Sequence, residues 1–417
     1  MSAVLRFFPH PSRWLMLVVP GLFCAGYTIG PGAVTKLAAA GAQGGASPLW
    51  LLVAGGLLSW ALLEACGRYT VATGVTALHG FRTHLRGGRW LALLVLVGIV
   101  LGQGSGLPVL VGVVARLIHS GWAPTQSPAG EMAVAAVMLG GVYTLLATGR
   151  FSVLMLLVAG SAALMAVGFL GALWIVGPAP EMLARGLVPS LPAAEDGLRP
   201  VVAVLGIALA APTFLVRSLV VKHASWNAAN AKDQRRDAAF SALVMLVIAG
   251  SVLACAAGAL DPKSLPVRDV FEAARGLDQV AGRRAAEFFR LGAIGAGLSS
   301  IIPMIVVLPL LIADFLGEGV QLHGLRFFVL TALACGIGWL GTLPGALLVS
   351  VHRTASLVAQ VFMLPAVVAG IFLLVNRGVL MGGQRAGFWL NAGLSLVFAF
   401  SLATSWLAVT GLWARLA

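Results

Sequence analysis

The chain has 417 residues, of which 59% are hydrophobic and only 10% are charged, and its mean hydropathy is +0.98. A soluble protein carries about a quarter charged residues, so this composition excludes an ordinary soluble domain and indicates a multi-pass membrane protein. A transmembrane barrel is excluded because the apolar runs are continuous and do not alternate. The net charge of +13 fits basic cytoplasmic loops better than nucleic-acid binding, so no nucleic-acid partner is expected.

Eleven hydrophobic segments follow one another, each long enough to cross a bilayer. The sequence predicts them at residues 14–43, 48–67, 90–118, 131–149, 151–176, 200–226, 238–259, 288–316, 325–350, 354–376 and 387–413. The longest polar stretches are 177–199 and 260–287. We therefore predict an all-α integral membrane protein with one domain over residues 1–417, and lipid is its expected surroundings.

The basic residues between the segments predict the orientation of the chain. One set of connections collects most of the bases, and the other set is poor in them except for the 260–287 loop; the basic set holds Arg68, Arg82, Arg86, Arg89, Lys232, Arg235, Arg236, Arg377 and Arg385. Arg6 and Arg13 lie on the same side. The positive-inside rule therefore places the N-terminus in the cytoplasm and, with an odd number of helices, the C-terminus outside. No cleavable signal pattern precedes the first segment, and we expect the inner (cytoplasmic) membrane.

Two segments are interrupted near their middles. The first holds Gly30-Pro31-Gly32 and the sixth holds Pro212. Proline removes a backbone donor, and glycine is a poor helix former. Matched interruptions in two halves are typical of inverted-repeat transporters with a site near the bilayer midplane. The pattern predicts repeats over about 14–176 and 200–376, with an extra helix at about 387–413. Four other prolines are interpreted as plain kinks, namely Pro108, Pro303, Pro344 and Pro365.

Several stretches resemble one transporter family. They are GPGAVTKLAAAGAQGG in the first segment, LLEACGRYTVATG in the second, AAPTFLV and WNAANAKDQRRDA around the sixth, AGLSS in the eighth and LLVNRGVLMG after the tenth. In this order they are similar to the Nramp proteins, which are proton-coupled transporters of divalent metals. The resemblance implies the LeuT-type fold with a 5+5 inverted repeat, broken helices 1 and 6, and secondary-active transport by alternating access.

The resemblance also implies where the metal ligands should be. The family uses an Asp-Pro-Gly-Asn turn and a Met-Pro-His turn, and the matching positions here are Gly30, Ala33, Ala211 and Thr213. Transition metals favour imidazole, carboxylate or sulfur, and these positions offer none of them. The site expected at the two breaks comprises Gly30, Pro31, Gly32, Ala33, Thr35, Ala210, Ala211, Pro212 and Thr213. Backbone carbonyls and threonine hydroxyls are its remaining polar groups.

Two bases lie close to the breaks. Lys36 and Arg217 are ionisable groups inside membrane segments, which makes them functional candidates. They would attract an anion or zwitterion and repel a dication. In the alternative interpretation they extend to an interface or pair with Glu64 or Asp314, the acids assigned to hydrophobic spans.

The sequence leaves the substrate open. One hypothesis is a divalent metal bound through carbonyls and water, and the other is a different small solute such as an anion or zwitterion. A receptor-like or scaffold protein is a third, less favoured interpretation. The histidines are interpreted as surface or interfacial groups, with His352 in a loop, and the four cysteines as buried apolar residues. No catalytic motif is found, so we expect no enzyme activity, no cofactor, no resident metal and no protein partner.

Overall fold

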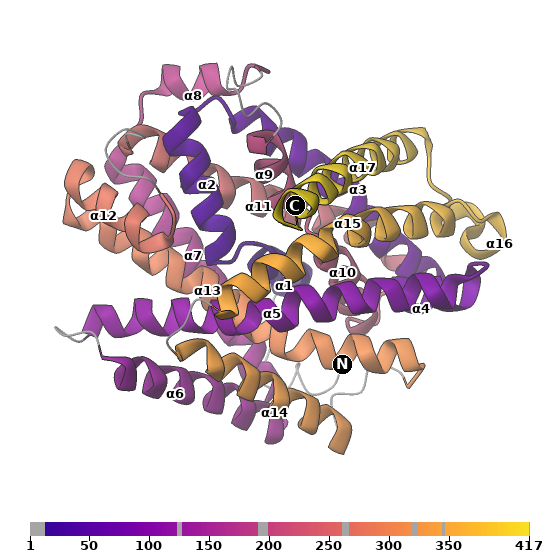
Figure 1. Cartoon of the computed structure of the whole chain (residues 1–417). Helices are drawn as coiled ribbons and strands as arrows, with labels where there is room; N and C mark the ends of the chain where they lie inside the picture. Colours follow the sequence, from indigo (N-terminus) through magenta and orange to yellow (C-terminus); the bar gives the residue numbers. More distant parts are fainter. Residues whose placement is uncertain are drawn as a thin grey trace.

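The computed structural model describes residues 13–122, 127–190, 199–260, 267–318, 324–343 and 347–416, and every regular element within them is a helix. Figure 1 shows the arrangement of these helices. In chain order they are α1 (Arg13–Thr28), α2 (Pro31–Gly44), α3 (Leu49–Thr73), α4 (Ala77–His84), α5 (Gly88–Trp122), α6 (Pro128–Ala147), α7 (Phe151–Val176), α8 (Pro180–Gly186), α9 (Arg199–Ala208), α10 (Ala211–His223), α11 (Ala231–Ala259), α12 (Val270–Ala281), α13 (Arg283–Leu316), α14 (Leu325–Trp339), α15 (Leu347–Val375), α16 (Gly378–Met381) and α17 (Phe388–Leu416). Short 3-10 turns cover Ala228–Asn230, Leu340–Thr342 and Gly382–Gln384.

Ten of the eleven predicted membrane segments are confirmed, in the predicted order. Within the described residues, ten helical spans are long and apolar enough to cross a membrane, and α9 with α10 counts as one of them. The first predicted segment is not among these ten spans. Its break divides it into α1 with 16 residues and α2 with 14, and each of these helices is too short to count alone. The all-α fold class is therefore confirmed, whereas the division into repeats over 14–176 and 200–376 stays a prediction.

Helix α11 occupies a central position in the bundle. It packs against α2, α3, α1 and α7, while α7 also lies along α13 and α5 lies along α15. Close approach of α7 and α13 depends on glycine, because a Cβ atom on Gly168 would collide with the backbone of Gly292. In Figure 1, α2, α8 and α12 lie toward one end of the bundle and α4 and α16 toward another. We call these the α8 end and the α4 end.

Several helix boundaries differ from the predicted ones. Helix α11 begins at Ala231 and not near 238, so the charged stretch 231–237 is helical rather than a connector. The ninth segment ends at Thr342, where the backbone becomes extended at Leu343, before Pro344. Helix α15 then begins at Leu347, which places His352 in a helix and not in a loop. Hydropathy misses these ends because polar residues on a protein-facing helix surface look like a loop.

Most of the prolines interpreted as kinks lie inside continuous helices. Pro108 is inside α5, Pro303 is inside α13 and Pro365 is inside α15. Pro344 lies outside the described residues. Tertiary packing therefore keeps the helix intact at these three prolines, while the chain at Pro31 and Pro212 starts a new helix.

Candidate functional site at the two helix breaks

The first break separates α1 from α2. Helix α1 ends at Thr28, Gly30 is extended with φ −92° and ψ 174°, and α2 starts at Pro31. The Gly30 carbonyl accepts hydrogen bonds from the amides of Ala33 and Val34, at 2.9 and 3.0 Å. Proline suits the first helical position because its fixed φ matches the helix and its missing N–H would have no helical partner there. The predicted interruption is confirmed.

The second break separates α9 from α10. Helix α9 ends at Ala208, and Ala210 is extended with φ −65° and ψ 106°. Helix α10 starts at Ala211, so that Pro212 again lies in the first turn, and the Thr213 amide donates to the Ala210 carbonyl at 3.0 Å. The predicted second interruption is therefore also confirmed, one or two residues before the proline.

Serine side chains satisfy backbone carbonyls that the breaks release. Ser300 of α13 donates to the Gly26 carbonyl at 2.7 Å, and Ser59 of α3 donates to the Ala208 carbonyl. Both hydroxyls are buried. An unpaired carbonyl is costly in an apolar interior, so these serines stabilise the non-helical geometry.

A threonine pair joins the two breaks. The hydroxyl oxygens of Thr28 and Thr213 lie 2.8 Å apart, and Thr28 also donates to the Cys24 carbonyl at 2.7 Å. A hydroxyl has one proton, so Thr213 donates to Thr28. A cavity of about 20 Å³ adjoins Thr28 and Ser59, which is room for roughly one water molecule. The site residue Thr35 is directed elsewhere, because its hydroxyl donates to the Pro31 carbonyl at 3.0 Å.

Lys36 lies on an exposed face of α2. Gly32 and Lys36 are one turn apart and both are exposed, and a Cβ atom on Gly32 would meet nothing within 4 Å. No ion pair or hydrogen bond links Lys36 to another described residue. His352 of α15 lies within electrostatic reach of Lys36, and its Nδ1 is 3.1 Å from the Ser105 hydroxyl of α5. The Lys36 ammonium is therefore available to a solute that reaches α2.

Arg217 has a partner that was not predicted. Its side chain is fully buried and forms an ion pair with Asp237 of α11, while its Nη2 donates to the Gln234 carbonyl at 3.1 Å. Asp237 also accepts from the Gly21 amide of α1, at 3.2 Å. The paired carboxylate neutralises Arg217, so this arginine does not supply a second positive charge for an anion. The expectation that only Glu64 and Asp314 are acids within the spans is wrong, because α11 begins early enough to bury Asp237.

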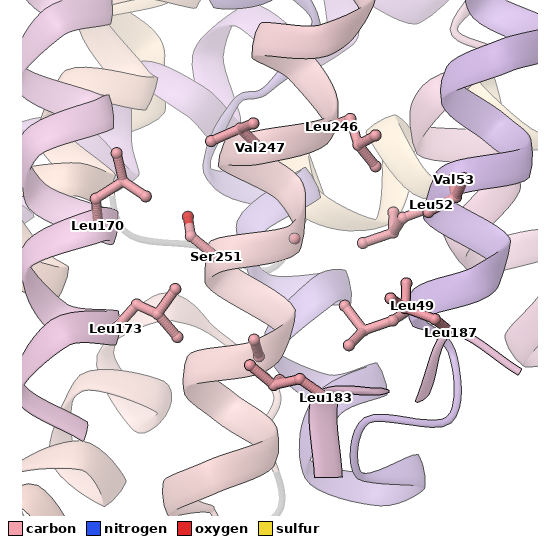
Figure 2. A pocket seen from close by; sticks show the side chains of 12 residues that line it. Leu49, Leu52, Val53, Leu170, Leu173, Leu183, Leu187, Leu246, Val247 and Ser251 are labelled. Atoms are coloured by element: carbon pink, nitrogen blue, oxygen red, sulfur yellow. The ribbon is translucent and has the colours of Figure 1, made fainter. Parts of the chain in front are cut away.

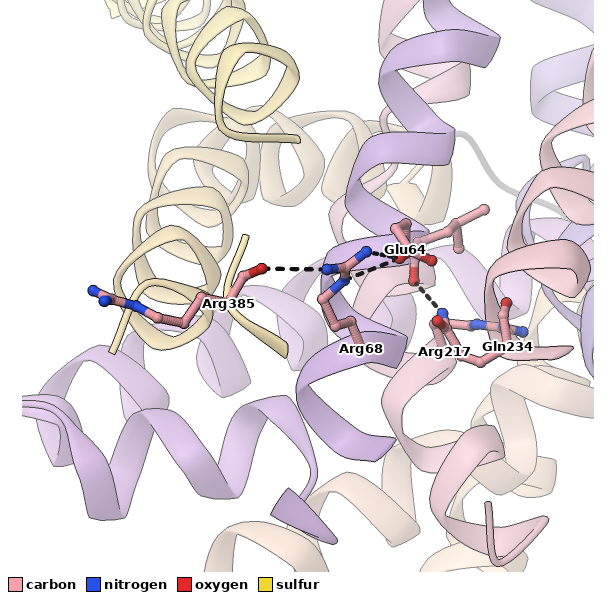
Figure 3. Close-up of polar contacts among 6 residues, drawn as sticks. Glu64, Arg68, Arg217, Gln234 and Arg385 are labelled. Carbon is pink, nitrogen blue, oxygen red and sulfur yellow. Dashed lines mark hydrogen bonds and ion pairs between the residues drawn. The ribbon is translucent and has the colours of Figure 1, made fainter. Parts of the chain in front are cut away.

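The two acids considered as partners are engaged elsewhere. Glu64 accepts from Arg68 of the same helix at 2.7 Å, and Arg68 donates to the Arg385 carbonyl; Figure 3 shows these contacts beside Arg217 and Gln234. Asp314 of α13 accepts from the Thr76 hydroxyl at 2.6 Å. These interactions connect α3 to Arg385, which precedes α17, and α13 to Thr76, the N-cap residue of α4.

Burial differs between the two halves of each broken helix. On the α4 side, every residue from Phe23 to Gly26 is buried, and so is every residue from Thr213 to Leu219. On the α8 side, Gly32, Lys36 and Gly206 are exposed. In the described part of the chain, the residues next to the breaks are therefore buried more continuously toward the α4 end than toward the α8 end, where Lys36 is exposed.

Sequence reasoning missed Asp237, Ser59 and the Ser105–His352 pair. Asp237 and His352 were assigned to connectors, and hydropathy gives no signal that a helix continues through them. Ser300 belongs to the quoted AGLSS motif, but the motif did not reveal that its hydroxyl reaches α1. Within the described residues, no group of three or more His, Cys, Asp or Glu side chains could hold a metal ion.

Comparisons with known proteins place this architecture. Residues 21–411 match the sequence model of the family described as Natural resistance-associated macrophage protein-like, Nramp. The Eremococcus coleocola manganese transporter, solved with an aromatic bis-isothiourea substituted compound, has a TM-score of 0.77 and 16% identity, over 96% of this chain and 88% of that one.

Two further solved structures have the same architecture. MhsT in complex with L-phenylalanine has a TM-score of 0.62 and 17% identity, over 96% and 98% of the two chains. A substrate-bound Na⁺-coupled sialic acid symporter has a TM-score of 0.62 and 11% identity, over 94% and 90%. A search of curated proteins gave no match. Because the family model matches nearly the whole of this chain and both helix breaks are present, the chain belongs to the Nramp family and is a secondary-active membrane transporter with the LeuT-type fold.

Proposed function

We propose that this transporter carries a small solute with a negatively charged group, such as a carboxylate, and not a transition metal. The observation that carries the proposal is the exposed Lys36, one turn beyond Gly32 on the α8 side of the first break. An ammonium group there favours an anion and repels a dication. The N-terminal ends of α2 and α10 add partial positive charge at the same place.

The side chains at the family's ligand positions support the same choice. Gly30, Ala33 and Ala211 carry no ligand atom in their side chains, and Thr213 is hydrogen-bonded to Thr28. Two of the structural neighbours have carboxylate ligands: MhsT was solved with L-phenylalanine, and the symporter is named for sialic acid. The second candidate is transport of a divalent metal, which the family and the manganese transporter favour.

We also propose that the protein lies in the inner membrane with its N-terminus in the cytoplasm. The bases near the α4 end support this orientation, among them Arg82, Arg86 and Arg236. The α8 end then faces outside, and Lys36 is reached from there. Alternating access would require the contact between Asp237 and Gly21 of α1 to open toward the cytoplasm.

The test is uptake by proteoliposomes of Mn²⁺, L-phenylalanine, sialic acid, acetate and inorganic phosphate. We expect uptake of at least one of the four organic or inorganic anions and zwitterions, and none of Mn²⁺. Lys36→Gln should abolish that uptake, and Lys36→Arg should retain part of it because it keeps the charge. Lys232→Gln, at an exposed lysine of α11, is the matched control. Uptake of Mn²⁺ alone, or wild-type uptake by Lys36→Gln, would refute the proposal.

A further inference from the structure

An apolar groove of about 310 Å³ lies between α3, α7 and α11, and α8 lies at one end of it. Figure 2 shows aliphatic side chains around it, including Val53 of α3, Leu170 of α7 and Leu246 of α11. Its size falls at the lower end of the range of small-molecule sites, roughly 300–1,000 Å³. The groove fits a flexible hydrocarbon chain, since aliphatic walls offer burial and almost no polar contact.

Helix α8 and the residue that follows it have one face on this groove and another on a second recess, which is largely apolar but contains two charged side chains. Leu183 and Leu187, four residues apart, line the groove. Glu181 and Arg185, also four residues apart, line a second recess of about 340 Å³, together with Ser47 of the α2–α3 turn. The exposed Ala184 lies between these two faces on the helix surface, so a flexible molecule with a hydrocarbon chain and a charged head can reach from the groove across α8 to the recess.

The two charges of the recess are not paired with each other. Two other Arg and Glu residues at the same spacing form ion pairs, Glu64 with Arg68 at 2.7 Å and Arg283 with Glu287 at 2.8 Å. Among the described residues, no ion pair involves Glu181 or Arg185. The recess therefore presents one carboxylate and one guanidinium, which complement a headgroup with an ammonium and a phosphate.

Two tryptophans indicate the depth of this site in the membrane. Trp174, in the last turn of α7, is 88% exposed. Trp50, at the start of α3, donates from Nε1 to the Ser190 carbonyl at 3.0 Å, just after α8. Tryptophan is enriched at the level of the lipid headgroups. Helix α8 therefore lies where headgroups are, and the groove runs toward the hydrocarbon.

We propose that the groove and the recess together bind one phospholipid with an ethanolamine headgroup. The acyl chain occupies the groove along Leu183 and Leu187, the phosphate contacts Arg185 and the ammonium contacts Glu181. This site lies on the outer surface of the bundle and is separate from the Lys36 site. The occupant is a phosphatidylethanolamine because it offers both charges and an ammonium that can donate hydrogen bonds.

The test is native mass spectrometry of the full chain released from nanodiscs that contain equal parts of phosphatidylethanolamine, phosphatidylcholine and phosphatidylglycerol. We expect one retained lipid. Phosphatidylethanolamine should be retained about fivefold more than each competitor, which is the preference that one additional charge contact at a surface gives. Glu181→Gln and Arg185→Gln should each remove that preference. Equal retention of the three lipids, or preference for another of them, would overturn the proposal.

A second variant tests the groove itself. Gly250 lines the groove, and a Cβ atom there would meet nothing within 4 Å, so Gly250→Leu fills the groove without a backbone clash. We expect this variant to lose the retained lipid. Gly140→Leu is the matched control, because Gly140 of α6 is exposed and equally open but lies outside the groove. Wild-type retention by Gly250→Leu would also overturn the proposal.

Discussion

The hydroxyls of Thr28 and Thr213 lie 2.8 Å apart and join the two helix breaks, although the two threonines are 185 residues apart in the sequence. Each threonine lies at the edge of its break, and Thr213 occupies a position where the family has a metal-binding imidazole. The pair therefore replaces coordination by a neutral hydrogen bond and holds α1 against α10. This contact adjoins the buried residues on the α4 side of the two breaks.

Thr213→Val should weaken the connection between the breaks. Valine has a similar shape but no hydroxyl, so the Thr28 oxygen loses its donor in a half-buried place. We expect the free energy of unfolding to fall by about 1 kcal/mol, measured by thermal unfolding in detergent. Thr144→Val is the control, because the Thr144 hydroxyl is exposed and bonds only to its own helix. Equal losses in both variants would contradict the assignment.

Arg217→Met should be strongly destabilising. It leaves the Asp237 carboxylate buried with only the Gly21 amide as a partner, and breaking a buried pair from one side costs about 3–5 kcal/mol. The double variant Arg217→Met with Asp237→Leu removes both charges and should recover part of this loss. Thermal unfolding of the two single variants and the double variant measures the coupling. Strictly additive losses would show that the two side chains do not stabilise each other.

Gly32→Cys should react quickly with a membrane-impermeant maleimide in a cysteine-free background. Gly32 is exposed and open, whereas Ala25, on the other side of the break, is fully buried. We expect modification of Gly32→Cys from outside the cell and little modification of Ala25→Cys. The rates are measured by gel shift in intact cells. Faster labelling of Ala25→Cys than of Gly32→Cys would contradict both this difference in burial and the proposed orientation.

His84 should make stability depend on pH. Burial, followed by His79 and Arg377, lowers the pKa of His84 from 6.5, and the Tyr69 hydroxyl lies 2.9 Å from its Nδ1. When the proton of neutral His84 is on Nε2, its Nδ1 accepts from Tyr69, and protonation removes that acceptor. The contribution is therefore present above pH 6.5 and is lost as the pH falls through the lowered pKa.

The measurement for His84 is the difference in melting temperature between pH 7.5 and pH 5. We expect a smaller decrease for His84→Gln than for the wild type, because glutamine does not titrate. Tyr69→Phe removes the hydrogen-bond donor and should also reduce the decrease. A decrease in His84→Gln equal to that of the wild type would exclude a role for this histidine.

The elements that depend on local chemistry were predictable from the sequence. Continuous apolar runs predict the membrane spans. Lipid offers no hydrogen-bond partner to the backbone, so the backbone groups must bond to one another within a helix. Gly30-Pro31-Gly32 and Pro212 predict the breaks, since proline removes a donor and starts a helix easily. The sequence also shows that the family's ligand side chains are replaced at Gly30, Ala33, Ala211 and Thr213, because the residue type at a position can be read without a structure.

The partners of the polar residues were decided only by the tertiary structure. The sequence gives the number of residues between Arg217 and Asp237 but not the path of the chain between them. Hydropathy alone therefore places Asp237 in a connector and does not reveal that it contacts Arg217. Lys36 and Arg217 look alike in the sequence, yet α2 exposes the first and α10 buries the second against α11. Sequence thus determined the helices and where they break, because those follow from each residue's own backbone and polarity. Only packing decided which charge is neutralised and which is available, because that depends on the helix that lies opposite.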